Sequence, residues 1–166
     1  MATNMKFTQT YPANTSAVRS MFIDPEYIKA RALATGAQSV DHMITNEPNG
    51  QTTVVITRTL PSEMPAFAAA IVGDTLTITE TQIWEPEFLG QCFGQFSVTF
   101  SAPLTFTGSA SITHADDTTV VTTEGELKAS IPFMGGKVEN LAKEQTERYL
   151  RKEQEFAQAW LREHSR

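Results

Sequence analysis

Apolar and polar residues alternate through most of the middle of the chain, between about residues 38 and 131. Runs of Thr, Val, Ile and Phe are separated there by turn residues, such as Pro48-Asn49-Gly50 and the Asp116-Asp117 pair. Alternation with a period of two places the apolar side chains of a strand on one face. The pattern predicts strands at residues 38–46, 51–60, 74–84, 94–101, 104–113 and 119–131, after a first strand at 5–11.

The end of the chain has a helical period instead. No Pro or Gly follows the breaker sequence at 132–136. Steps of three and four then relate Val138, Leu141, Ala142, Gln145, Tyr149, Phe156 and Trp160. This spacing predicts an amphipathic helix of about 25 residues, roughly 38 Å long. Such a helix is stabilised mainly by burying its apolar stripe, and the predicted sheet is the surface long enough to cover it.

Two short helices are predicted between the first and second strands. Asn14 or Thr15 can cap a helix that runs to residue 22, and Asp24 followed by Pro25 starts a second helix that runs to residue 34. Residues 61–73 predict a short helix or lid between the third and fourth of the seven strands. The fold class is therefore α+β, with helices on one side of an antiparallel sheet.

Composition limits the class of protein and its partners. The chain has 166 residues, and we expect residues 1–166 to form one domain with a sizeable core. Its formal net charge of −6 argues against nucleic acid or an anionic membrane as the main partner. No apolar run has the length of a membrane span, so we expect no stable membrane insertion. With one cysteine, Cys92, and no signal-peptide pattern, a soluble cytoplasmic protein is expected.

Several segments resemble a known superfamily. The order of elements is similar to the helix-grip fold of the START, polyketide-cyclase and plant-allergen-like (SRPBCC) superfamily. The sequences Tyr11-Pro12-Ala13, Asp24-Pro25, Ile83-Trp84-Glu85-Pro86 and residues 131–139 resemble a bacterial branch described as a domain of unknown function. The resemblance implies a curved seven-stranded sheet that grips the last helix, with a cavity between them. The superfamily uses this cavity for lipids, sterols, polyketides and plant hormones, and some members are cyclases or dehydratases.

Polar residues occur in the inward phase of the predicted strands. Glu80 and Gln82 share a face with Trp84, and His42 shares one with Val40 and Ile44. A dry core disfavours such groups, because an unpaired buried polar group costs about 1–3 kcal/mol. A β-bulge in the fourth strand would instead turn Glu80 and Gln82 to solvent.

Three further positions extend this polar set. On the last helix, Gln145 and either Lys152 or Glu153 fall on the inward stripe. The phase of the third strand is ambiguous, and one choice turns Arg58 inward.

The leading hypothesis is a non-catalytic module that binds a small apolar ligand, such as a lipid, an isoprenoid or a polyketide-like molecule. No metal-ligand spacing, phosphate loop or dinucleotide fingerprint occurs, so no metal or cofactor is expected. Polar residues would orient one end of the ligand, namely His42, Glu80, Gln82 and Gln145. Apolar contacts would come from Phe67, Ile71, Trp84, Phe96, Phe106, Tyr149 and Phe156.

Two alternatives belong to other classes. A cyclase or dehydratase would use His42 or Glu80 as a general base, which requires both side chains near one point of the cavity. A protein-interaction domain, including a homodimer, would use the apolar residues as an interface and contain no cavity.

Overall fold

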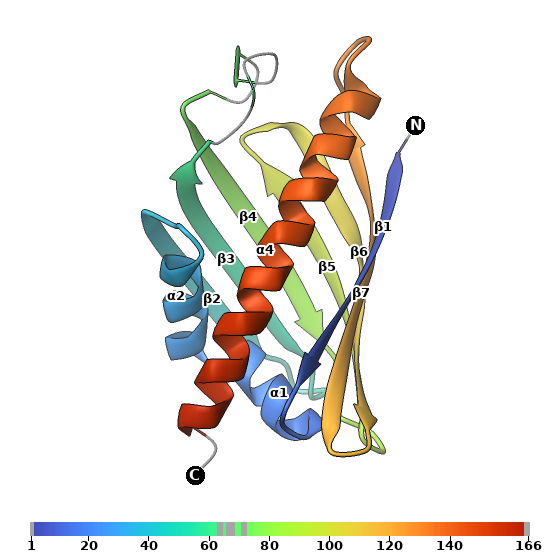
Figure 1. Ribbon diagram of the computed structural model, residues 1–166. Helices are drawn as coiled ribbons and strands as arrows, with labels where there is room; N and C mark the ends of the chain where they lie inside the picture. Colours follow the sequence, from blue (N-terminus) through green and yellow to red (C-terminus); the bar gives the residue numbers. More distant parts are fainter. Residues whose placement is uncertain (1, 63–64, 66–68, 71–72, 165–166) are drawn as a thin grey trace.

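The computed structural model describes residues 2–62, 65, 69–70 and 73–164. The strands form one antiparallel sheet in the order β1-β7-β6-β5-β4-β3-β2 (Figure 1). The elements are β1 (Thr3–Tyr11), α1 (Thr15–Phe22), α2 (Pro25–Ala34), β2 (Ser39–Asn46), β3 (Thr52–Pro61), β4 (Thr75–Trp84), β5 (Gln91–Phe100), β6 (Ala102–Ala115), β7 (Thr118–Ala129) and α4 (Gly135–His164).

The predicted α+β helix-grip architecture is confirmed. In Figure 1, α4 runs diagonally across one face of the curved sheet, and α1 and α2 lie toward the C-terminal end of α4. Side-chain caps start the two short helices, as the sequence predicts. Asn14 accepts a hydrogen bond from the Ala17 amide at 2.8 Å, and Asp24 accepts one from the Glu26 amide at 2.9 Å.

The long helix α4 has 30 residues, and its buried stripe differs from the predicted one. Tyr149 and Phe156 are only partly buried, whereas Leu150 and Ala157, one position further along, are buried. Val138 and Ala142 are buried as predicted, so only in the second half of the helix is the buried face displaced by about one residue, which is about 100°. The buried face carries Val138, Glu139, Ala142, Leu150, Glu153, Ala157 and Leu161.

The fourth strand is regular, which decides the orientation of its polar residues. β4 pairs with β3 from Thr75 to Trp84 and with β5 from Ile78 to Trp84, without a break in register. The β-bulge that would have turned Glu80 and Gln82 outward is therefore absent from this strand. The same register settles the phase of β3, because Arg58 is opposite Ile78 and is buried.

Buried apolar side chains form two clusters that lie on either side of a polar region. One cluster joins α1, α2 and the end of α4 to the sheet, and includes Tyr11, Phe22, Tyr27, Trp84 and Leu161. The other lies under the first half of α4, and includes Ile78, Val98, Phe106, Val138 and Ala142. This division places the polar side chains of β3, β4 and α4 in the interior between the two clusters.

Among the described residues, no helix has both the length and the apolar composition needed to cross a membrane. The predicted short helix or lid at residues 61–73 lies largely outside the described residues. Cys92 is the second residue of β5, and its side chain is buried.

Two glycines lie opposite each other where β6 and β7 pair. Gly108 is in register with Gly125, and a Cβ atom at Gly108 would overlap the backbone carbonyl oxygen of Glu124. The missing side chain therefore lets the two strands approach, and it does not enlarge the interior. Because backbone cannot yield as a flexible side chain does, a larger residue is poorly tolerated here.

We expect Gly108→Ala to lower the free energy of unfolding by about 1–3 kcal/mol, the usual range for overpacking. Gly136→Ala is the matched control, since a Cβ atom there meets nothing within 4 Å and the residue lies in α4. The control should be neutral or stabilising by up to about 1 kcal/mol, because Ala favours helix more than Gly. Urea denaturation of both variants measures the difference, and equal stabilities would contradict the prediction.

Candidate functional site

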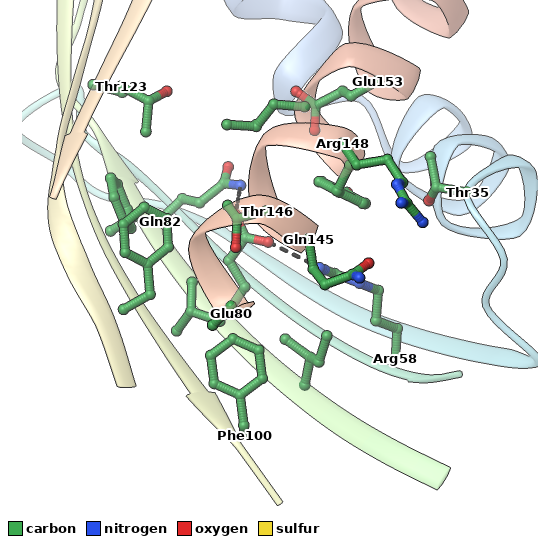
Figure 2. Close-up of a pocket in the computed structure, with 18 of the residues that line it drawn as sticks. Thr35, Arg58, Glu80, Gln82, Phe100, Thr123, Gln145, Thr146, Arg148 and Glu153 are labelled. Atoms are coloured by element: carbon green, nitrogen blue, oxygen red, sulfur yellow. Dashed lines mark hydrogen bonds and ion pairs between the residues drawn. The ribbon is translucent and has the colours of Figure 1, made fainter. Parts of the chain in front are cut away.

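A pocket of about 260 Å³ lies between the inner face of the sheet and α4. Its apolar wall comes from the central strands and the first half of the helix, as in the second apolar cluster. Figure 2 shows polar side chains of β3, β4 and α4 projecting into the same space. The apolar lining includes Leu60, Leu76, Ile78, Phe96, Val98, Phe100, Leu104, Phe106, Ile131, Val138 and Ala142.

A chain of polar contacts runs across β3 and β4 at one side of the pocket. The Arg58 guanidinium lies 3.2 Å from a carboxylate oxygen of Glu80. The Gln82 amide donates to the other oxygen of Glu80 at 2.5 Å, and the Trp84 indole N–H donates to the Gln82 carbonyl oxygen at 2.9 Å. Alternate residues of a strand share one face, so β4 itself aligns Glu80, Gln82 and Trp84.

A second charged pair lies between α2 and α4. Arg31 and Glu153 are 3.5 Å apart, and their side chains are only 4% and 9% exposed. No hydrogen bond joins these two side chains, so their contact is looser than that of Arg58 and Glu80. Gln9 of β1 lies in the same region and donates to the Leu150 carbonyl oxygen at 2.8 Å.

The two carboxylates have pKa shifts in opposite directions. Burial alone raises the pKa of Glu80, but the Arg58 and Arg31 guanidinium groups and the Gln82 amide lower it more, so the net shift is downward. For Glu153, burial raises the pKa, and the guanidinium of Arg31 does not compensate for that burial. Glu80 is therefore a stable anion, whereas Glu153 is the carboxyl that holds a proton more readily.

Several buried polar atoms near these pairs have no hydrogen-bond partner in the described part of the chain. They are the hydroxyl oxygens of Tyr11, Tyr27 and Tyr149, and the Nε atom of Arg31. Burial raises the pKa of all three phenols, so their hydroxyl groups stay protonated and can donate. Of these residues, Arg31 and Tyr149 line the pocket, where the Tyr149 ring lies 5.0 Å from the Arg58 guanidinium carbon. Buried polar groups are normally hydrogen-bonded, so the atoms of Arg31 and Tyr149 have hydrogen-bonding capacity left at the pocket.

Most of the site residues expected from the sequence lie around this pocket. Its lining includes Glu80, Gln82, Trp84, Phe96, Phe106, Gln145 and Tyr149. Their roles as ligand contacts stay predictions. Phe67 and Ile71 lie outside the described residues.

Two residues that the sequence places at the site lie outside the lining of this pocket. Phe156 does not line the pocket but packs against Tyr27 and Trp160, with ring centroids 6.0 and 6.2 Å apart. This follows from the displacement of the buried face in the second half of α4. His42 lies opposite Ile56 on the edge strand β2, where its side chain is exposed and outside the pocket lining. Ile56 in turn is opposite Glu80, so His42 is two strand spacings, about 10 Å, from Glu80 and cannot share a proton with it.

Arg31 was not among the site residues predicted from the sequence, although the spacing of residues in α2 indicates that it is buried. Tyr27, Ile28, Arg31 and Ala32 are the buried residues of α2, and their spacing of one, three and four is that of one helix face. Both candidates on α4 line the pocket, Glu153 as a buried residue and Lys152 as an exposed one. In the part of the chain that is described, His, Cys, Asp and Glu side chains do not form a group of three or more that could hold a metal ion.

Solved structures of other proteins have the same fold. The chain aligns with a START superfamily protein from Mycobacterium smegmatis at 15% identity, over 95% of this chain and 98% of that chain, with a TM-score of 0.57. The Zhui aromatase/cyclase from Streptomyces sp. R1128 aligns at 14% identity, over 96% and 90%, with a TM-score of 0.57. Human STARD10 aligns at 10% identity, over 97% and 66%, with a TM-score of 0.64. At these identities the likeness establishes the helix-grip fold of the START superfamily and nothing about activity.

The chain belongs to the family described as "Protein of unknown function (DUF2505)", which matches residues 6–161. This agrees with the bacterial branch that the sequence resembles. A comparison with curated protein sequences gives no match.

We expect Glu155→Gln and Glu153→Gln to differ in how stability depends on pH. Folding raises the pKa of Glu153, so ionised Glu153 destabilises the native state once the pH exceeds its unfolded-state pKa of about 4.3. Wild type should therefore lose stability relative to Glu153→Gln as the pH rises from about 4 to about 8. Glu155→Gln removes one carboxylate from an exposed position of the same helix and is the control for the substitution. Denaturant titrations at each pH measure this, and parallel curves for Glu153→Gln would contradict it.

Proposed function

We propose that the protein binds a small apolar ligand with one polar end in the pocket between the sheet and α4. The observation that carries this proposal is the division of the pocket lining. One side consists of aliphatic and aromatic side chains, and the other holds Arg58, Glu80, Gln82 and Tyr149. A mostly apolar cavity with a few convergent polar groups is the usual form of a small-molecule site.

The polar residues of the pocket support non-catalytic ligand binding better than they support an enzyme. The cyclase or dehydratase hypothesis needs a general base near neutral pH, and the carboxylate of Glu80 is a weak base because its pKa is lowered. His42, the other candidate base, does not line the pocket. The superfamily likeness adds to the proposal, since STARD10 and the START superfamily protein share this fold.

A residue that fills the pocket should abolish binding of an apolar probe. Ala142 is buried on α4 and lines the apolar part of the pocket. We expect Ala142→Phe to weaken binding of the small fluorescent probe 1-naphthylamine by about tenfold or more, as lost apolar burial of about 1.5–3 kcal/mol implies. Fluorescence titration gives the affinities.

Ala159→Phe is the control for this experiment, because Ala159 is exposed on the same helix and lies outside the pocket lining. It should bind the probe as wild type does. Circular dichroism checks that both variants are folded. Equal binding by folded Ala142→Phe and wild type would place the probe elsewhere, and no probe binding by wild type would count against the proposed function.

A further inference from the structure

The charge of the pocket is opposite to the charge of the chain. Four cationic residues line it, Arg31, Arg58, Arg148 and Lys152, against two carboxylates, so the lining has an excess of two positive charges. The chain as a whole has a formal net charge of −6. Among the described residues, neither Arg148 nor Lys152 forms an ion pair with a carboxylate. Cationic groups gathered in a cleft of an acidic protein favour an anionic ligand.

The two buried guanidinium groups are not equally engaged. Arg58 contacts Glu80 at 3.2 Å and lies over the Tyr149 ring. Arg31 likewise lies over a ring, that of Tyr27 at 5.6 Å from its centroid, but its nearest carboxylate, Glu153, is at 3.5 Å and its Nε–H has no hydrogen-bond partner. Arg31 is only 3% exposed, so bulk water does not readily supply the hydrogen bond that its Nε–H group lacks. Arg31 is therefore the buried cation with capacity left for an incoming acceptor.

We propose that the ligand is an amphipathic carboxylic acid, whose carboxylate binds Arg31 beside Glu153 and whose hydrocarbon part occupies the apolar side of the pocket. This rests on the proposed function and adds the chemical class of the ligand. A guanidinium offers two parallel N–H donors that match the two oxygens of a carboxylate. A dianionic phosphate would place more negative charge near Glu80 and Glu153, and an alcohol would leave the cation uncompensated.

The proton on Glu153 couples binding to pH. Two carboxylates beside one guanidinium repel each other, so the site takes a ligand anion best when Glu153 is neutral. Burial raises the pKa of Glu153, which makes that state accessible. As the pH rises and Glu153 ionises, the affinity for the acid should fall. The groups around Glu153 are Arg31 and Tyr27 of α2, Arg58 of β3, Glu80 of β4, Gln9 and Tyr11 of β1, and Tyr149 of α4.

The pocket volume limits the length of the acid. A volume of 260 Å³ equals that of roughly nine water molecules at about 30 Å³ each. If each heavy atom takes a similar volume, the apolar space holds about nine heavy atoms, which is the number of carbons that decanoic acid has beyond its carboxyl group. Decanoic acid is therefore a suitable probe, and decanol is its neutral match.

The first experiment compares these two probes by titration calorimetry near pH 6.5, where a carboxylic acid with a pKa of about 4–5 is ionised. Wild type should bind decanoate about tenfold or more tightly than decanol, as a charge-assisted hydrogen bond implies. Arg31→Gln should lose this preference while its decanol affinity stays within about threefold. Arg151→Gln removes the same charge from an exposed position of α4 outside the pocket lining and should behave as wild type.

The outcomes separate this inference from the proposed function. Equal affinity of wild type for the acid and the alcohol would overturn the carboxylic acid and leave the apolar pocket supported. Binding of neither probe would count against both. An unchanged preference in Arg31→Gln would exclude Arg31 as the anchor. If Arg31→Gln does not fold, Arg31→Gln/Glu153→Gln removes both charges of the pair and tests the same preference.

The second experiment follows the decanoate affinity from about pH 6 to about pH 8.5, a range in which the free acid stays ionised. Wild type should lose affinity as the pH rises, approaching tenfold per pH unit where one proton is fully linked to binding. Glu153→Gln should bind decanoate with little dependence on pH. A wild type without pH dependence, or the same slope in Glu153→Gln, would overturn the role of Glu153.

Discussion

The structure depends on the pairing of charges that lie beneath α4. Arg31, Arg58, Glu80 and Glu153 come from four different elements, α2, β3, β4 and α4, and all four line the pocket. Removing an ion from water is costly, so a buried guanidinium needs a polar partner. Glu80 is an anion beside Arg58, whereas Glu153 beside Arg31 has a raised pKa and holds its proton more readily. The contact of Arg31 with Glu153 forms only when α2 and α4 are docked on the same side of the sheet.

The same charges explain why the core is divided into two parts. Apolar side chains pack densely where α1, α2 and the end of α4 meet the sheet, and again under the first half of α4. The polar groups lie between these clusters, where Gln82, Trp84 and Tyr149 also contribute. A polar region with unpartnered hydroxyl groups next to an apolar pocket suits an amphipathic ligand better than a dry core, since unpaired buried groups lower stability. The fold alone does not decide this, because related folds serve different functions.

Much of the architecture and part of the site could be predicted from the sequence. Strand alternation correctly placed Glu80, Gln82 and Trp84 on one inner face, because the side-chain period of a strand is two and β4 has no bulge. The same reasoning failed for His42. The alternation along a strand predicts which face of the sheet a side chain lies on, but it does not predict whether another element covers that face. His42 is exposed because β2 is at the edge of the sheet. On α4, the spacing of large apolar residues predicted that Phe156 lies on the inner face, whereas the buried face there includes Glu153 and Ala157. An acidic residue and a small residue contribute little to the hydrophobic pattern of a helix, so the pattern did not predict their burial.

The sequence by itself determined the order and type of the elements, the helix caps, the antiparallel sheet and the inward polar residues of β4. These features follow from local propensity and periodicity, which act over a few neighbouring residues. The tertiary structure alone decided the buried face in the second half of α4, the exposure of β2, and the meeting of Arg31 with Glu153 across 122 sequence positions, from 31 to 153. Such contacts depend on how separate elements dock, and a charge is buried only where its partner arrives from another part of the chain.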